Sequence, residues 1–416
     1  MLSERWLRAH PEQARAALRR RQSGEETLAA LDGWLALDTE RRDAATRFDA
    51  LATEFKRLSA AHDQRQAQAR AELRAIQRVL DDLTERMRGL ALALPNAPDP
   101  RVPDGADATA NRFVRSWGAM PTFDFTPQPH DVLGVALGIL DLPRATRMSG
   151  PRFPLLVGAG ARLARALAAF MLDAHRAEGY VEVAPPDLLL AATLTGTGHL
   201  PRHAHELFAL PDDGLYLSPT AEAQLVALHA GERLAANALP LAYTAYTQAY
   251  RREAGSAGAR THGLLRQRQF GKVELVRVVA PELAEDALTS LIASAEALLR
   301  RLDLPYRVVE LCAGELPFSA QRTFDLEVWL AGEGRYIEIS SVSDCGEFQA
   351  RRLDLRYRPR PGALAYPHTL NGSALPIGRT LAALLERGQR ADGSVALPSA
   401  LVAYGAPAIL EPATAE

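Results

Sequence analysis

Residues 246–274 read YTQAYRREAGSAGARTHGLLRQRQFGKVE, and the rest of the chain is organised around this stretch. The aromatic run at 243–250, the small-residue loop at 254–258 and the rough apolar–charged alternation at 264–276 predict a long β-hairpin. Arginine carries a planar, permanently charged donor fork that fits phosphate or carboxylate oxygens in pairs. A grip on a nucleotide triphosphate and a solvated charged hairpin both explain the pattern. The candidate groups are Arg260, Arg266, Arg268 and the aromatic Phe270.

Composition sets the outer limits of the interpretation. With 416 residues, 47% of them hydrophobic and 24% charged, the chain is long enough for two or three domains with a large core. A formal net charge of -2 means that any nucleic acid must be held by local basic faces. Cys312 and Cys345 have no disulfide or metal-ligand pattern. No signal peptide or membrane-spanning run is found, so a cytoplasmic protein with no membrane partner is expected.

Residues 27–94 predict an antiparallel coiled-coil arm of two helices, joined by a polar bend near 60–68. The second helix carries a heptad seam in alternating steps of three and four: Leu73, Ile76, Leu80, Leu83, Met87, Leu90 and Leu94. One flank near the tip is basic, with Arg65, Arg70, Arg74 and Arg78. This flank is a candidate for phosphate contacts. Dimerisation, a spacer role and a simple solvated face remain alternatives.

A proline-rich segment at 95–103 predicts the boundary between a domain at 1–102 and a domain at 103–416. In the second domain, residues 104–150 are predicted to be irregular and residues 371–385 to form a loop and a closing helix. Other predicted elements are helices at 158–180 and 281–302 and strands at 181–186, 214–217, 306–310, 323–330 and 335–341. Hairpin strands with helices between them predict an α+β fold with an antiparallel sheet. The absence of GxGxxG after a strand and of GxxxxGK[ST] argues against a parallel nucleotide-binding fold.

Eight short stretches, in order, resemble the seryl-tRNA synthetases, a class II aminoacyl-tRNA synthetase family. They are RMSGPRF from Arg147, GTGHLPR from Gly196, PTAE from Pro219, YRREAGSAG from Tyr250, FDLEVWL from Phe324, YIEISS from Tyr336, FQARR from Phe348 and TLNGSALPIGRTLAALLE from Thr369. The resemblance implies a class II catalytic domain behind a tRNA-binding arm. It also implies a homodimer, because helix, strand and Pro-Pro at 158–186 follow the order of the family's interface motif.

The resemblance implies a two-step reaction with ATP and Mg²⁺. L-Serine becomes seryl-adenylate, and the seryl group then passes to the 3′ end of tRNA(Ser) and tRNA(Sec). Such chemistry depends on charge neutralisation and positioning. Alternatives are a diverged second copy, such as one serving antibiotic resistance, an amino acid:carrier-protein ligase, whose known relatives lack the arm, and a non-catalytic scaffold.

The resemblance also implies roles for individual residues. Arg251, Glu338 and Arg379 are the expected catalytic groups, with Arg251 on the α-phosphate and the serine carboxylate. Glu253 accepts from the adenine amino group, Phe270 stacks on adenine, and Arg266 and Arg379 hold the terminal phosphate. Glu338 and Ser341 hold Mg²⁺. The ATP set is completed by Arg252, Ile339 and Ser340, and the serine set by Thr220, Ala221, Glu222, Glu274, Asn371 and Ser373.

Four positions depart from the family pattern. They are Arg268 in RQF for HQF, His262 in RTHG for an acidic-Thr-Arg-Gly run, Asp344 in SVSD for SCSN, and Ala374 for glycine. None removes a residue assigned to a substrate. The first two lie in the hairpin segment that, in the family, closes over ATP and then tRNA.

Overall fold

The computed structural model describes residues 1–61, 64–254 and 262–413, and it divides into two compact units, Met1–Ala97 and Pro98–Glu416. The division falls within the proline-rich segment 95–103, a little before the predicted boundary after residue 102. The hairpin residue Arg260 lies outside the described part of the chain. Among the described residues, none of the helices is both long and apolar enough to cross a membrane.

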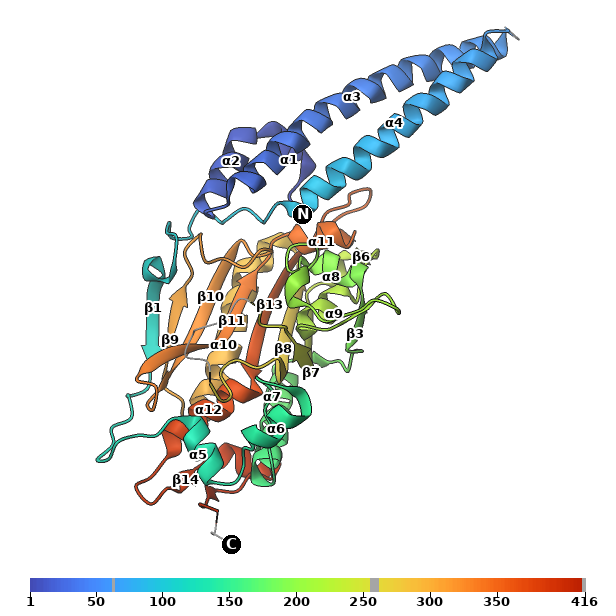
Figure 1. Cartoon of the computed structure of the whole chain (residues 1–416). Coiled ribbons are helices and arrows are strands. Elements are labelled where there is room, and N and C mark those ends of the chain that lie inside the picture. The colour runs from blue at the N-terminus through green and yellow to red at the C-terminus, as the bar shows by residue number, and fades with distance from the viewer. Residues whose placement is uncertain (62–63, 255–261, 414–416) are drawn as a thin grey trace. The chain divides into compact units, whose positions relative to one another are not determined.

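The first unit is helical. Its elements are α1 (Glu4–Ala9), α2 (Pro11–Arg20), α3 (Glu25–Ala60) and α4 (Gln66–Ala93). The long helices α3 and α4 lie side by side as an antiparallel hairpin (Figure 1), with heptad residues such as Leu83 and Met87 buried in the seam. At the base of this arm, α1 and α2 add Leu7 and Leu18 to the same core. The base is therefore a four-helix core, and only the distal part of the arm is a simple two-helix structure.

The second unit is built on an eight-stranded sheet (Figure 1). The strands lie in the order β1 (Arg112–Trp117), β9 (Tyr306–Glu310), β10 (Arg322–Leu330), β11 (Arg335–Asp344), β13 (His368–Pro376), β8 (Gln269–Val279), β7 (Leu241–Tyr250) and β2 (Val181–Glu182). Neighbouring strands are antiparallel except for the short parallel pair of β2 and β7. The predicted α+β fold with an antiparallel sheet is confirmed.

The main core lies between one face of this sheet and the helices α7 (Ala159–Ala177), α10 (Ala284–Arg301) and α12 (Ile377–Gly388). On β8, Val273 and Leu275 point into this core, whereas Val276 and Val278 belong to a second cluster with α9 (Ala221–Ala227). This division follows from the two-residue repeat of a strand. The even-numbered face of β8 is thus the one that α9 partly covers and where a site can form.

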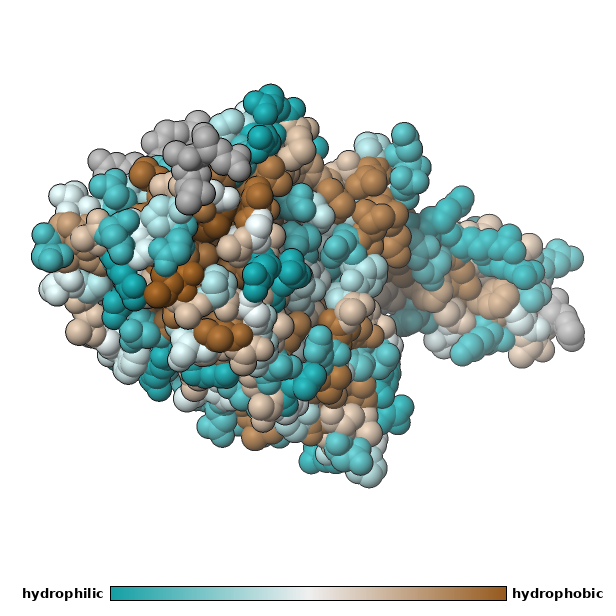
Figure 2. Space-filling view, turned by 90° about the horizontal axis from the view of Figure 1, so that it is seen from below, coloured by the Kyte–Doolittle hydropathy of each residue, from teal (hydrophilic) through white to brown (hydrophobic). Residues whose placement is uncertain are grey.

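Shorter elements complete the second unit. They are α5 (His130–Ala136), α6 (Leu142–Ser149), β3 (Leu188–Leu190), α8 (Ala191–Thr197), β4 (Ala209–Leu210), β5 (Leu215–Leu217), β6 (Arg233–Ala235), α11 (Phe348–Arg352), β12 (Arg356–Arg358), β14 (Val395–Ala396) and β15 (Ile409–Leu410). Figure 2 views the end that carries α5, α6 and β14 in Figure 1 and shows apolar groups interspersed with hydrophilic ones.

Several predicted elements were wrong in detail. Residues 104–150 are not irregular throughout, because they contain β1, α5 and α6, and β1 pairs with the distant strand β9. Every residue of β1 is exposed or half-buried, so the alternation that marks a strand was missing. The return strand begins only at Gln269, since Leu264 and Leu265 turn into the main core. Residues 371–376, predicted as a loop, continue β13, and the strand predicted at 181–186 is limited to β2.

Candidate active site

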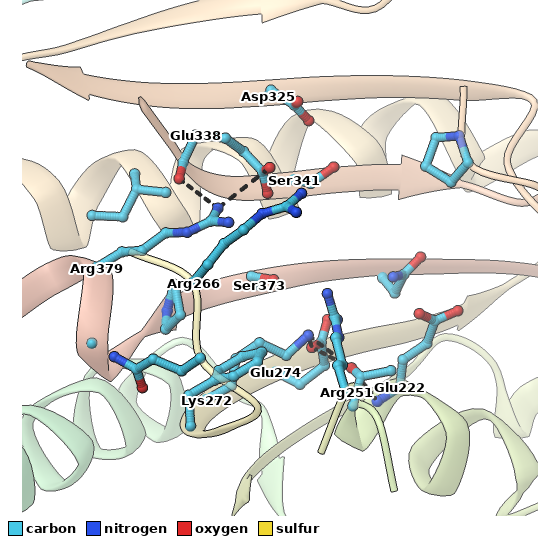
Figure 3. Close-up of a pocket in the computed structure, with 18 of the residues that line it drawn as sticks. Glu222, Arg251, Arg266, Lys272, Glu274, Asp325, Glu338, Ser341, Ser373 and Arg379 are labelled. Atoms are coloured by element: carbon cyan, nitrogen blue, oxygen red, sulfur yellow. Dashed lines mark hydrogen bonds and ion pairs between the residues drawn. The ribbon is translucent and has the colours of Figure 1, made fainter. Parts of the chain in front are cut away.

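A cavity of about 450 Å³ lies over the even-numbered face of β8. Its walls come from β8, β10, β11, β13, the start of α9 and the segment that follows β7. Phe270, Lys272 and Glu274 line it at every second position of β8, while Asn371 and Ser373 do the same on β13. The two-residue repeat thus gathers polar groups on one face while the intervening apolar residues fill the core. Figure 3 shows two charged clusters, one around Glu338 and the other around Glu274.

The first cluster contains Asp325, Glu338 and Ser341. In the pairing of β10 with β11, Asp325 lies directly opposite Ser341. The register shifts between Leu326 and Glu327, so that Glu327 lies opposite Glu338. The Oδ1 atom of Asp325 is buried and has no hydrogen-bond partner among the described residues. Burial, followed by the charge of Glu338, raises the pKa of Asp325 well above its usual range. Two carboxylates and a hydroxyl form an all-oxygen donor set of the kind that Mg²⁺ prefers, so these residues fit that ion.

Two arginines close this end of the cavity. Arg379 donates from Nη1 to the backbone carbonyl of Glu338 at 2.7 Å, and its Nε donates to the carbonyl of Leu265 at 3.2 Å. Arg266 forms an ion pair with Glu253 at 3.3 Å. Both guanidinium groups therefore line the cavity from positions fixed by backbone or carboxylate contacts, as a phosphate-binding pair requires.

Arg251 lies between the two clusters. Its Nε donates to the carbonyl of Pro219 at 3.2 Å, and its guanidinium carbon is 5.4 Å from the centre of the Phe270 ring. Glu253, two residues further on, adopts a left-handed backbone conformation with φ of 54°. The carbonyl of this residue accepts from Arg152 at 2.9 Å, which helps to hold the turn after β7. The predicted ATP residues Arg251, Glu253 and Phe270 thus meet in one cavity.

The second cluster contains Glu222, Glu274, Lys272 and Thr220. Lys272 forms an ion pair with Glu274, and the Thr220 hydroxyl donates to Glu274 Oε2 at 2.9 Å. Gln349 Nε2 donates to Glu222 at 2.7 Å. Burial and then the nearby charge of Glu274 raise the pKa of Glu222 to about 7. One buried and one half-buried carboxylate beside one lysine make an environment that favours a small cationic ligand.

On the neighbouring strand, Ser373 lies directly opposite Glu274 in the β13–β8 pairing, and Asn371 lies opposite Val276. Both side chains line the cavity. The predicted serine-binding residues Glu222, Glu274, Asn371 and Ser373 are therefore brought together, although they are spread over three elements far apart in the sequence.

Three of the residues that the resemblance assigned to ATP or serine do not line the cavity, and neither does the hairpin candidate Arg268. Ala221 is fully buried in the cluster beneath α9. Arg252 donates from Nε to the carbonyl of Leu207 at 2.7 Å and lies over the Phe208 ring. Ser340 is buried and donates to the carbonyl of Ser373 at 2.5 Å. Each is the immediate neighbour of a cavity residue in the sequence. Ser340 lies on β11, where successive side chains point to opposite faces, whereas Ala221 begins α9 and packs beneath it.

Several cavity residues had no role assigned from the sequence, among them Lys272, Asp325 and His199. His199 and Asp325 lie in stretches that carry the family resemblance, and Lys272 lies in the hairpin segment 246–274. Burial, followed by the charges of Arg251, His203 and Lys272, lowers the pKa of His199 to about 3, so its imidazole is neutral at physiological pH. His199 Nδ1 lies 2.9 Å from the Thr197 hydroxyl.

The departures from the family pattern have structural partners. Both ring nitrogens of His262 lie 2.8 Å from carboxylate oxygens, Nδ1 from Asp131 and Nε2 from Glu333. His262, Asp131 and His130 have metal-ligand geometry, but His130 already bonds Glu386 through Nδ1 and the Leu264 amide through Nε2. These bonds therefore hold the hairpin segment beside α5.

The other departures are also accommodated. Asp344 accepts from Gln321 Nε2 at 2.8 Å and from the Gly346 amide at 2.7 Å, and Ala374 is fully buried in the main core. The Arg268 amide donates to the carbonyl of Arg152 at 2.9 Å. None of these three side chains lines the cavity.

The antiparallel sheet and its arginine-lined cavity define a class II aminoacyl-tRNA synthetase, and the family model of the tRNA synthetase class II core domain (G, H, P, S and T) matches residues 208–388. The chain is 45% identical to a serine–tRNA ligase from Sorangium cellulosum, with 97% of this chain and 98% of that protein covered. It is 43% identical to one from Pseudothermotoga lettingae at the same coverage of each chain. The chain belongs to the serine–tRNA ligase family.

Solved structures agree with this assignment. The seryl-tRNA synthetase from Pyrococcus horikoshii, crystallised with ATP, superposes with a TM-score of 0.95 at 30% identity and covers 100% of both chains. The cytoplasmic serine–tRNA ligase from Naegleria fowleri, in complex with AMP, superposes with a TM-score of 0.88 at 25% identity, covering 97% of this chain and 96% of that one.

Proposed function

We propose that the chain activates L-serine with ATP and transfers the seryl group to the 3′ end of tRNA(Ser) and tRNA(Sec). The observation that carries this proposal is one cavity with arginines and oxygen ligands at one end and the carboxylates of Glu222 and Glu274 at the other. The first end suits a nucleotide triphosphate. The second suits a small ligand with an ammonium group and a hydroxyl group.

In the activation step, a carboxylate oxygen of serine attacks the α-phosphorus of ATP, and the bond to the bridging oxygen of pyrophosphate breaks. Arg251 is placed between the two charged clusters, so its guanidinium can neutralise both the α-phosphate and the attacking carboxylate (Figure 3). Phe270 supplies a flat apolar face for adenine, and Glu253 accepts from the adenine amino group. Arg266 and Arg379 hold the terminal phosphate. These residues position reactants and stabilise charge, and none needs to carry a proton.

Glu338 and Ser341, with Asp325 beside them, would hold Mg²⁺. Bound there, the ion supplies charge neutralisation on the phosphate oxygens. Ile339 lines the same wall, whereas Arg252 and Ser340 support the site from behind through their backbone contacts.

Serine is selected at the opposite end. Glu222 pairs with the substrate ammonium, and Glu274 accepts a hydrogen bond from the substrate hydroxyl. Asn371 and Ser373 lie on the adjoining strand. A site whose buried polar groups are satisfied only by a hydroxyl rejects an analogue lacking it by roughly 10⁴-fold. Alanine and glycine are excluded in this way. Thr220 acts through Glu274 and Lys272, because its hydroxyl is bonded to both.

The arm and a second copy of the chain complete the proposal. Arg65, Arg70, Arg74 and Arg78 are exposed at the start of α4, where they can contact tRNA phosphates. A homodimer is supported by exposed apolar residues at the β2 and β3 side of the second unit, namely Val181 at 58%, Leu188 at 45% and Leu190 at 62% exposed. Sedimentation at micromolar concentration distinguishes a dimer from a monomer.

ATP–pyrophosphate exchange with each standard amino acid, followed by charging of purified tRNA, tests the function. We expect exchange with serine alone and charging of tRNA(Ser). Exchange without tRNA charging, together with loading of a carrier protein, would indicate a carrier-protein ligase. No exchange with any amino acid would contradict the proposal and favour a paralogue that has lost activation.

A further inference from the structure

Lys272 is a buried cation within the second cluster. Its side chain is 7% exposed, and it lies two residues before Glu274 on the same face of β8. The ammonium donates to the Thr220 hydroxyl at 2.7 Å and forms the ion pair with Glu274. The second oxygen of Glu274, Oε1, makes no hydrogen bond within the described residues, so it is the oxygen left for a ligand.

The Thr220 hydroxyl fixes the direction of these bonds. It accepts from Lys272 and, as the cap of α9, from the Glu222 amide at 3.3 Å. A hydroxyl has one proton, and here that proton is donated to Glu274 Oε2 at 2.9 Å. Glu274 Oε2 therefore accepts from two donors, Lys272 and Thr220. Both bonds hold the Glu274 carboxylate in this orientation.

Lysine is rare in this chain, which sets Lys272 apart. Lys56 and Lys272 are the two lysines among 48 cationic side chains, and all the others are arginines. Lys56 is exposed on α3. At position 272 the partners are one hydroxyl and one carboxylate oxygen, a geometry that suits a compact ammonium better than the planar fork of an arginine.

Among the groups around Glu274, Lys272 is the cation that forms an ion pair with it. Glu222 from α9 is a second carboxylate, and Arg251 lies toward the middle of the cavity. His199 is neutral, β13 contributes uncharged Asn371 and Ser373, and β7 places Ala245 opposite Glu274. A buried carboxylate that loses its cation is strongly destabilised in the ionised form.

We propose that Lys272 is a positioning residue for amino-acid selection, which holds Glu274 in the orientation in which its second oxygen, Oε1, accepts a hydrogen bond from the serine hydroxyl. The proposal rests on the proposed function, because it concerns the same pocket. Lys272 does not touch the reacting atoms. It contributes to the preference for serine over alanine through Glu274.

The first test compares Lys272→Met, Lys272→Arg and the control Lys56→Met in pyrophosphate exchange with serine and with alanine. We expect Lys272→Met to lower kcat/KM for serine on the order of 100-fold, mainly through KM, while alanine falls much less. Lys272→Arg should recover part of the serine preference, and Lys56→Met should match the wild type.

A second measurement uses the presence of only two lysines. In protein labelled with ¹⁵N-lysine, Lys56→Met assigns the two Nζ signals, and serine but not alanine should shift that of Lys272. Equal loss for serine and alanine, or identical shifts with both ligands, would overturn the proposal in favour of a purely structural ion pair. Because the labelling experiment uses unaltered position 272, it remains decisive even where Lys272→Met fails to fold. Wild-type protein that does not respond to serine at all would instead refute the proposed function.

Discussion

The guanidinium of Arg379 donates to the backbone carbonyl of Glu338 at 2.7 Å and lies 3.3 Å from its carboxylate. The residue assigned to the terminal phosphate and the residue assigned to Mg²⁺ therefore neutralise each other in this structure. ATP and its metal ion must replace an existing ion pair, so their binding should be mutually dependent. Asp325, which sequence reasoning overlooked, lies beside this pair as a further carboxylate.

Asp325→Asn should raise the Mg²⁺ concentration needed for half-maximal pyrophosphate exchange by about tenfold or more, because an oxygen that supports the ion loses its charge. Titration of Mn²⁺ followed by electron paramagnetic resonance, in the presence of ATP, checks the affinity without turnover. The matched control is Asp354→Asn, which removes a carboxylate paired with Arg233 and Arg356 outside the cavity. Unchanged metal affinity in Asp325→Asn would remove Asp325 from the site.

Arg251→Ala should lower serine-dependent exchange on the order of 100-fold or more, equivalent to about 3 kcal/mol or more of transition-state stabilisation. The reason is that one guanidinium serves both the α-phosphate and the serine carboxylate. The control is Arg252→Ala, because the neighbouring guanidinium lies over Phe208 and does not line the cavity. Its effect on exchange should be much smaller. Arg251→Ala with activity within a few-fold of the wild type would contradict the assignment.

The KM for serine should rise as the pH falls below about 7. Burial and the charge of Glu274 raise the pKa of Glu222 to about 7, so below that pH the ligand-free pocket holds Glu222 mainly in its protonated form. The serine ammonium requires the ionised form, and binding must then expel a proton, which weakens it by up to about tenfold per pH unit. Above pH 7 the KM should level off. Exchange kinetics between pH 5.5 and 8.5 at saturating ATP measure this effect.

In Glu222→Gln the serine KM should be high and should lose this pH dependence. The KM for ATP, measured over the same range, controls for titration of the nucleotide itself. A serine KM in the wild type that is flat between pH 5.5 and 8 would show that Glu222 does not hold the ammonium in its ionised form.

Shortening the arm should separate the two steps of the reaction. Removal of the whole segment 27–94 would strip Leu7 and Leu18 of their partners, because α1 and α2 share a core with the base of α3 and α4. Deletion of residues 46–80, closed by a short Gly-Ser turn, spares that core and removes the four arginines. In the shortened protein we expect near-normal pyrophosphate exchange and tRNA charging reduced by orders of magnitude. Charging by the wild type should weaken as the salt concentration rises, because it depends on phosphate contacts.

A milder variant replaces Arg70, Arg74 and Arg78 by glutamine and keeps the arm at full length. It should lose charging in part and show a shallower dependence on salt. Full charging by the shortened protein would assign the arm to dimerisation or to spacing, and sedimentation of the same protein would distinguish the two.

The sequence by itself determined the local and repetitive features. The heptad seam is sufficient to define α3 and α4, because a period of three and four places Leu83 and Met87 on one side of a helix wherever that helix lies. The strand at 306–310 was predicted with its observed ends, and the hairpin of β7 and β8 followed from its aromatic run and small-residue loop. The matching stretches brought Arg251, Glu338 and Arg379 to attention, and the structure places all three in one cavity.

The tertiary structure decided which member of each motif faces the cavity. Ala221, Arg252 and Ser340 stand next to cavity residues in the sequence yet point away from it, because tertiary contacts hold them elsewhere. Ala221 packs beneath α9, and Arg252 and Ser340 donate to the carbonyls of Leu207 and Ser373. β1 was invisible in the sequence, since its pairing with β9 joins segments almost two hundred residues apart and leaves no local alternation. The roles of Lys272 and Asp325 likewise could be inferred only from their burial beside other charged groups. Their surroundings come from strands and a helix distant in the chain, and no local pattern encodes such proximity.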